Sequence, residues 1–237
     1  MKNRAKILYS ALAALALGCL PFPPRAQAVL PTPDGGYPGG NTAEGHSALL
    51  SLTTGGFNTA VGFLSLKSDT TNSLNTAIGA GALLANTTDQ NTAIGAGALL
   101  NNTIGFQNTA VGAFALFSNT GVNLNTAVGA QALMANTGGL NTAIGGQALV
   151  NNTTGSFNTV NGASALQNNT TGSSNTALGA FAGGGVTTAS DVIAIGSQGG
   201  NVDSSCFIGH IRGVTTANND AIPVLIDSAG QLGTRTQ

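Results

Sequence analysis

The side chains that could perform acid–base or metal chemistry are few in this 237-residue chain, and they are widely spaced. General acid–base catalysis needs titratable side chains, and metal sites need carboxylates, imidazoles or thiolates placed close together. No Asp, Glu, Lys, Arg, His, Cys or Tyr lies between Asp89 and Asp191. The acidic residues are Asp34, Glu44, Asp69, Asp89, Asp191, Asp203, Asp220 and Asp227. We therefore expect no catalytic, cofactor-binding or metal-binding residues and a protein that is not an enzyme.

The charge distribution argues against binding to nucleic acid. Charged residues make up only 6% of the chain, whereas typical soluble domains contain about 25%. Only three of the seven basic residues lie after Val29, together with all eight acidic residues. Binding to phosphate groups needs clustered Lys and Arg side chains, so we expect no nucleic-acid partner.

The first 28 residues have the features of a secretory signal peptide. A basic start over residues 1–6 precedes an apolar run over residues 7–20, and Ala26-Gln27-Ala28 forms an A-x-A cleavage pattern. The run is shorter than the roughly 20 residues that span a bilayer. We expect cleavage after Ala28 and a secreted or cell-surface protein whose mature chain has no membrane span. An uncleaved anchor and a lipidated Cys19 are the alternatives.

A repeat of 16 or 17 residues dominates the rest of the chain. In all nine copies, Thr is the residue directly after the first Asn, and Gly is the fourth residue after that Asn. Val, Ile or Leu lies three residues after this Asn in seven copies, and Ala-Leu lies seven and eight residues after it in most. The first Asn of the copies is at positions 41, 58, 75, 91, 108, 125, 141, 158 and 175.

A further column locates the variable part of the repeat. Eleven residues after the first Asn, seven copies carry Asn or Asp, in both the 16-residue and the 17-residue copies. The length difference therefore falls after this column, in stretches such as Thr153-Thr154-Gly155-Ser156, whose residues are typical of turns. A solenoid tolerates length changes in its turns and not in its packed columns.

The repeat predicts an all-β fold, a parallel β-solenoid or β-roll of about nine coils over residues 41–183. A fixed Gly in each copy limits any helix to fewer than about ten residues, and such short helices are marginal. We predict one strand over Asn-Thr-Ala-Val/Ile-Gly, a second over Ala-Leu, and Asn-Thr-Thr-Gly as the return. Stacking would place the Val/Ile, Leu and Ala columns inside, and Asn side chains would stack by amide hydrogen bonds.

The segments on either side of the repeat are less regular. Residues 29–40 contain Pro and Gly clusters and predict a flexible leader. Residues 184–237 predict irregular coils, with two further coils at Val192–Gly196 and Cys206–Gly209. A C-terminal β-hairpin is predicted over Ile222–Gly233. The copies that begin at Asn41 and Asn175 break the column pattern, which is typical of end coils.

The remaining unusual side chains have ordinary interpretations. We expect Cys206 to be a small buried hydrophobe, with a disulfide between chains as the alternative. His46 and His210 are expected to be structural or surface residues rather than ligands. Five Phe residues near turns are expected to pack in the core, although stacking between chains or contact with a ligand stays open. They are Phe57, Phe106, Phe114, Phe117 and Phe157.

The segments Asn75–Ala82 and Asn91–Ala98 both read Asn-Thr-Ala-Ile-Gly-Ala-Gly-Ala. They resemble the head repeats of trimeric autotransporter adhesins, and the resemblance covers about residues 41–183. It implies a left-handed parallel β-roll, three chains wound about a common axis, and binding to host or surface ligands. The segment around Ile222–Gly233 resembles the one that precedes the intramolecular chaperone domain of phage tail spikes and fibres.

These observations together predict an exported, non-catalytic module for structure and adhesion at a surface. Its expected partners are two further copies of itself in a homotrimer and a surface or host ligand. A passive stalk or fibre spacer is one alternative. An ice-binding solenoid is another, and it requires the Thr column to lie on a flat outer face.

Overall fold

The computed structural model describes residues 38–209, 225–226 and 232–233. The expected signal peptide, nearly all of the expected leader over residues 29–40 and His210 lie outside the described residues. Every regular element in the described part of the chain is a β-strand. The all-β prediction is therefore confirmed.

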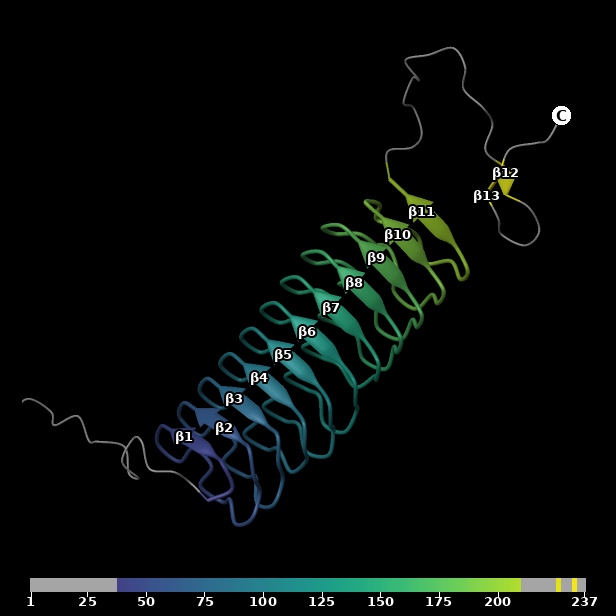
Figure 1. The fold of residues 1–237 in the computed structure, drawn as a ribbon. Coiled ribbons are helices and arrows are strands. Elements are labelled where there is room, and N and C mark those ends of the chain that lie inside the picture. The colour runs from purple at the N-terminus through teal and green to yellow at the C-terminus, as the bar shows by residue number, and fades with distance from the viewer. Residues whose placement is uncertain (1–37, 210–224, 227–231, 234–237) are drawn as a thin grey trace, which may run out of the picture. The chain divides into compact units, whose positions relative to one another are not determined.

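Eleven short strands form one parallel sheet, in which each strand pairs with the strands of the coils before and after it (Figure 1). Equivalent residues of successive copies lie opposite each other, as Ala77 lies opposite Ala93. The strands are β1 (Thr42–Glu44), β2 (Thr59–Val61), β3 (Thr76–Ile78), β4 (Thr92–Ile94), β5 (Thr109–Val111), β6 (Thr126–Val128), β7 (Thr142–Ile144), β8 (Thr159–Asn161), β9 (Thr176–Leu178), β10 (Ile193–Ile195) and β11 (Cys206–Ile208). The chain therefore forms the predicted parallel β-solenoid.

Each coil contains one strand, so the prediction of a second strand at Ala-Leu is wrong. These residues lie in a turn, and the Leu has a left-handed backbone, with φ of 50° at Leu83 and 49° at Leu99. A left-handed residue cannot continue an extended strand. The coils are still bonded on this side, because the Leu83 N–H donates to the carbonyl of Ala98 in the next coil at 3.1 Å.

The interior of the solenoid is narrow, and most coils hold two Ala side chains and one Leu there. The central residue of each three-residue strand faces inward and both neighbours face outward, because side chains alternate along a strand. This central residue is Ala except in β8, where it is Val160, and in β11, where it is Phe207. In β4, Ala93 is fully buried while Ile94 is 39% exposed. The prediction that the Val/Ile column lies inside is therefore wrong. The buried columns include Ala60, Ala77, Ala93, Ala110, Ala127, Ala143, Ala82, Ala98, Ala115, Ala132, Ala148, Leu66, Leu83, Leu99, Leu116, Leu133 and Leu149.

The first Asn of each copy belongs to a buried hydrogen-bond ladder along the solenoid. Its side-chain oxygen accepts a hydrogen bond from the backbone N–H of the equivalent Asn one coil later, at 2.8 to 3.0 Å from Asn41 to Asn175. Its amide nitrogen donates to a turn carbonyl, as Asn91 does to Gly105 at 2.9 Å. Because both ends of the amide have partners, these Asn side chains are buried without an unmet hydrogen bond.

A second buried column runs parallel to the first, eleven residues further along each copy. The amide nitrogen of Asn102 donates to the side-chain oxygen of Asn86 at 2.8 Å, and Asn119 donates to Asn102 at 2.9 Å. In the coil after Asn169, Val186 occupies the column position, and its side chain has no hydrogen-bond donor. The side-chain oxygen of Asn169 is accordingly the buried polar atom left without a partner in the described region.

The invariant Gly of each copy lets neighbouring coils approach closely. Gly145 has a φ of 132°, and a Cβ atom there would lie 2.5 Å from the carbonyl carbon and oxygen of Gly162. A side chain is thus excluded by both the backbone conformation and the contact. The Gly column fixes the separation of the coils at this corner.

The solenoid continues beyond the nine copies. β10 pairs with β9, and β11 pairs with β10, both in parallel, so the two less regular coils are confirmed. The copy that begins at Asn175 is therefore not an end coil. β12 (Leu225–Ile226) and β13 (Leu232–Gly233) pair in antiparallel orientation, as the predicted hairpin requires.

Replacement of adjacent glycines provides a test of the close approach. We expect Gly145→Ala to lower the free energy of unfolding by about 3 kcal/mol or more, because the new methyl group meets backbone atoms at a positive φ. Gly146→Ala is the matched control, since its Cβ would lie 3.9 Å from the nearest atom. We expect that variant to be neutral or stabilised by up to about 1 kcal/mol. Thermal and urea unfolding measure both, and equal stability of the two variants would contradict this packing.

Candidate functional site

Titratable side chains are sparse among the described residues, and Asp69 and Asp89 are close enough for their charges to interact. No group of three or more His, Cys, Asp or Glu residues lies close enough to hold a metal ion in that part of the chain. His46 is exposed, and its ring lies 5.8 Å from the ring of Phe63. The surfaces that remain as candidates are made of uncharged side chains and one exposed carboxylate.

Two predictions about burial are wrong. Cys206 is exposed at the start of β11, where the first strand position faces outward as in the other coils. None of the five Phe residues expected in the core is buried, because the narrow interior is filled by Ala and Leu. Their side chains are exposed or partly exposed at Phe57, Phe106, Phe114, Phe117 and Phe157.

The outer face of the parallel sheet carries two rows of mostly uncharged side chains. We call it the sheet face and define it as the first and third residues of strands β2 to β9. One row is Thr throughout, and the other is mostly Val and Ile, with Ile78, Ile94 and Ile144 38% to 40% exposed. An exposed apolar row of this length is typical of an interaction surface. The sequence alone does not reveal this surface, because the hydrophobicity of the Val/Ile column predicts that it is buried.

The Thr hydroxyls of the sheet face make no hydrogen bond within the described residues. Thr side chains in the turns differ, since the hydroxyl of Thr103 donates to the carbonyl of Thr120 and that of Thr153 to the carbonyl of Thr170, both at 2.9 Å. The sheet face therefore presents a regular row of unbonded hydroxyls about 4.8 Å apart.

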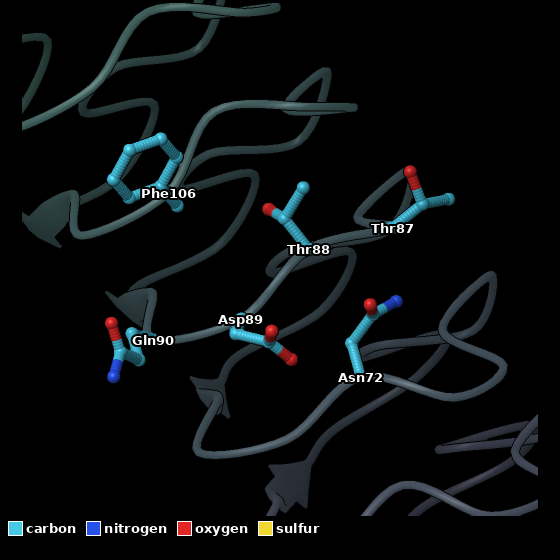
Figure 2. Close-up of a pocket in the computed structure, with 6 residues that line it drawn as sticks. All are labelled: Asn72, Thr87, Thr88, Asp89, Gln90 and Phe106. Atoms are coloured by element: carbon cyan, nitrogen blue, oxygen red, sulfur yellow. The ribbon is translucent and has the colours of Figure 1, made fainter.

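A second candidate surface is a notch in the row of turns. It lies at the 16-residue copy Asn75–Gln90, whose turn is one residue shorter than those of the copies on either side. The notch has a volume of about 220 Å³. Asn72 and Phe106 come from the two neighbouring coils, and the short turn supplies residues 87–90 (Figure 2). We call this site, lined by Asn72, Thr87, Thr88, Asp89, Gln90 and Phe106, the turn notch.

Some polar atoms of the turn notch are committed to other protein groups. One carboxylate oxygen of Asp89 accepts the Ser73 N–H at 2.6 Å, and the Thr88 hydroxyl donates to the Gly105 carbonyl at 2.6 Å. The side-chain oxygen of Gln90 accepts from the amide of Gln107 at 3.1 Å. The second carboxylate oxygen of Asp89 and the amide nitrogen of Gln90 have no partner within residues 38–209.

The sequence contained a signal for this notch. The spacing of 16 instead of 17 residues predicts a shorter turn, and in the structure this shorter turn leaves a hollow between its neighbours. The residues that wall the hollow come from other copies, so the spacing alone did not identify Asn72 or Phe106.

A buried carboxyl group, that of Asp69, accepts hydrogen bonds from Asn72 of the turn notch. Burial raises the pKa of Asp69 above its ordinary value of 3.8, and the nearby charge of Asp89 raises it further. Hydrogen bonds from Asn72 and Asn75 act in the opposite direction. Asp69 stands at the start of the second amide column, where the later coils carry Asn.

Comparisons with known proteins do not narrow the choice between these surfaces. No protein-family model, curated protein or solved structure matches the chain. Within the described ranges, no helix has the length and apolar character to cross a membrane. The function is therefore argued from the sheet face and the turn notch.

Replacement of the buried carboxyl group should change the pH dependence of stability. Because the folded state raises the pKa of Asp69, its contribution is fully favourable below the unfolded pKa and is lost as pH rises through the folded pKa. We expect Asp69→Asn to be more stable than the wild type by about 1 kcal/mol near neutral pH, since the neutral amide avoids the cost of burying a charged carboxylate. The difference should disappear in acid.

Thermal unfolding of both chains from about pH 7 down to about pH 3 measures this difference. The reverse substitution Asn102→Asp, in the same column, is the control and should be less stable at neutral pH than in acid, relative to the wild type. A constant difference between wild type and Asp69→Asn at all pH values would show that the Asp69 carboxyl does not carry the effect.

Proposed function

We propose that this protein is an exported, non-catalytic module for structure and adhesion, which assembles with copies of itself through the sheet face. The observation that supports this most strongly is the exposed Val/Ile row along the outer side of the sheet. An apolar patch exposed on a soluble protein is often an interaction surface.

The dimensions of the sheet face set the size of an interface between copies of the chain. The eight strands β2 to β9 at about 4.8 Å give a length of about 40 Å, and three extended residues give a width of about 10 Å. Two such faces in contact cover on the order of 800 Å² in total, which is the size of a small interface, so each copy must also use neighbouring surface to form a stable assembly. The sheet-face residues of β2 to β9 carry no charge, so identical faces can meet without like-charge repulsion.

Three copies is the assembly that we propose, because the repeats resemble those of a trimeric class of adhesins. Export is supported by the signal-peptide features of residues 1–28. The adhesive role would use the exposed turns of the assembled solenoids. A passive stalk would have the same assembly and no ligand.

A charge placed on the sheet face should prevent assembly. We expect the wild-type chain from Val29 onward to have the mass of three chains by light scattering, and Ile144→Lys to have the mass of one. The reason is that a buried, unpaired ammonium group costs several kcal/mol at an interface. Ile104→Lys is the matched control, because Ile104 is 67% exposed in a turn and lies outside the sheet face. A monomeric wild type would overturn the proposed assembly.

A second candidate function is binding to an ice or mineral lattice through the same face. The observation that favours it is the row of unbonded Thr hydroxyls, which face outward at a fixed spacing. Thermal hysteresis of the purified wild type, compared with Thr109→Lys and Thr126→Lys, tests this function. We expect no hysteresis if the sheet face is covered in a trimer, whereas hysteresis that is lost in these variants would favour the lattice-binding function.

A further inference from the structure

We propose that the turn notch binds one neutral sugar ring of a surface glycan. The inference rests on the proposed adhesive role and names its class of ligand. The turn notch is formed by a single short turn and its two neighbours, whereas assembly uses the rows of side chains along the whole sheet. The two proposals therefore depend on different residues.

The charge at the turn notch argues against an anion or a metal ion as the ligand. Its lining contains no Lys, Arg or His, and Asp89 is its one charged residue, so an anion would meet repulsion. A divalent cation would need several oxygen ligands. Both carboxylate oxygens of the nearby Asp69 already accept hydrogen bonds from Asn72 and Asn75, which leaves one carboxylate oxygen of Asp89 free.

The free polar atoms match hydroxyl groups. The unbonded carboxylate oxygen of Asp89 can accept from a sugar hydroxyl, and such a bond to a charged acceptor is stronger than a neutral one. The side-chain oxygen of Asn72, also without a partner in the described part, can accept from a neighbouring hydroxyl. The amide nitrogen of Gln90 lies at the opposite edge of the site from Asn72 and can donate to a hydroxyl there (Figure 2). A polyol with adjacent hydroxyls uses both donors and acceptors at once.

The shape of the turn notch suits a single ring. Phe106 is 43% exposed and forms one side of the site, where its ring offers an apolar surface to the C–H face of a sugar (Figure 2). The volume of about 220 Å³ is below the roughly 300–1,000 Å³ of pockets that enclose larger ligands. One ring with its hydroxyls can therefore enter while the rest of a glycan stays outside.

The lining is particular to this coil. The second 16-residue copy is Asn125–Leu140. It has Gly138, Gly139 and Leu140 at the positions where the notch copy has Thr88, Asp89 and Gln90. A short turn alone therefore does not supply the carboxylate and the amide. The second short turn provides a matched internal control.

The test is titration of the full chain with sugars, followed by amide chemical shifts in NMR spectra. The probes are glucose, galactose, mannose and N-acetylglucosamine, each used alone. We expect at least one to give saturable shifts at residues 72, 87–90 and 106, with a dissociation constant of about 1–10 mM. Phe106→Ala and Gln90→Ala should each weaken binding at least about tenfold, which is 1.4 kcal/mol. Phe157→Ala and Leu140→Ala, at exposed turn positions outside the notch, should bind as the wild type does.

Each outcome decides the proposal. It is overturned if none of the four sugars gives saturable shifts, if the control variants lose binding to the same extent, or if Ca²⁺ alone reproduces the shifts. Two notch variants are used because either one could fail to fold, which its own NMR spectrum would show. The other variant then tests sugar binding at the notch. Repeating the titration with Ile144→Lys separates the two proposals, because sugar binding by this variant would uphold the notch independently of assembly. A monomeric wild type that binds the sugar would refute only the assembly.

Discussion

The structure depends on hydrogen bonds between successive coils, in which equivalent residues of neighbouring copies lie opposite each other. Most importantly, the side-chain oxygen of one repeat Asn accepts the backbone N–H of its equivalent in the following coil. A single coil cannot satisfy these groups by itself, so the coils are stable only as a stack. Register also explains the composition, because a charged column would place like charges about 5 Å apart.

The stack also compensates for backbone strain within each coil. Leu83, Leu99 and Leu116 have φ values of 49° to 51° in the left-handed region, where a non-Gly residue costs about 1–2 kcal/mol. The left-handed turn at Leu keeps each coil narrow, so that the interior holds mainly Ala and Leu. The larger Val, Ile and Phe side chains of the repeats therefore lie mostly outside. The narrow interior thus places the Val/Ile row on the outside and forms the apolar sheet face. The notch has a different origin, which is a turn that is one residue shorter.

The repeat spacing was sufficient to predict the parallel stacking, the amide hydrogen bonding of the Asn column and the two additional coils near Val192 and Cys206. It could not predict which residues of Thr-Ala-Ile face inward, since hydrophobicity favours burial of Ile and only the width of the coil excludes it. Nor could it predict a left-handed Leu, because intrinsic preference reserves that conformation for Gly, Asn and Asp. The turn notch had a signal in the 16-residue spacing, but Asp89 and Phe106 become neighbours only after stacking.

Amide hydrogen exchange at the repeat Asn residues tests the stacked ladder most directly. The backbone N–H groups of Asn75, Asn108 and Asn158 are bonded to side-chain oxygens of the preceding coil. They should exchange only through opening of the stack, and Asn108→Ala should accelerate exchange at Asn125, which loses its acceptor. Exchange at these positions as fast as in an unfolded chain would contradict the in-register ladder on which the account rests.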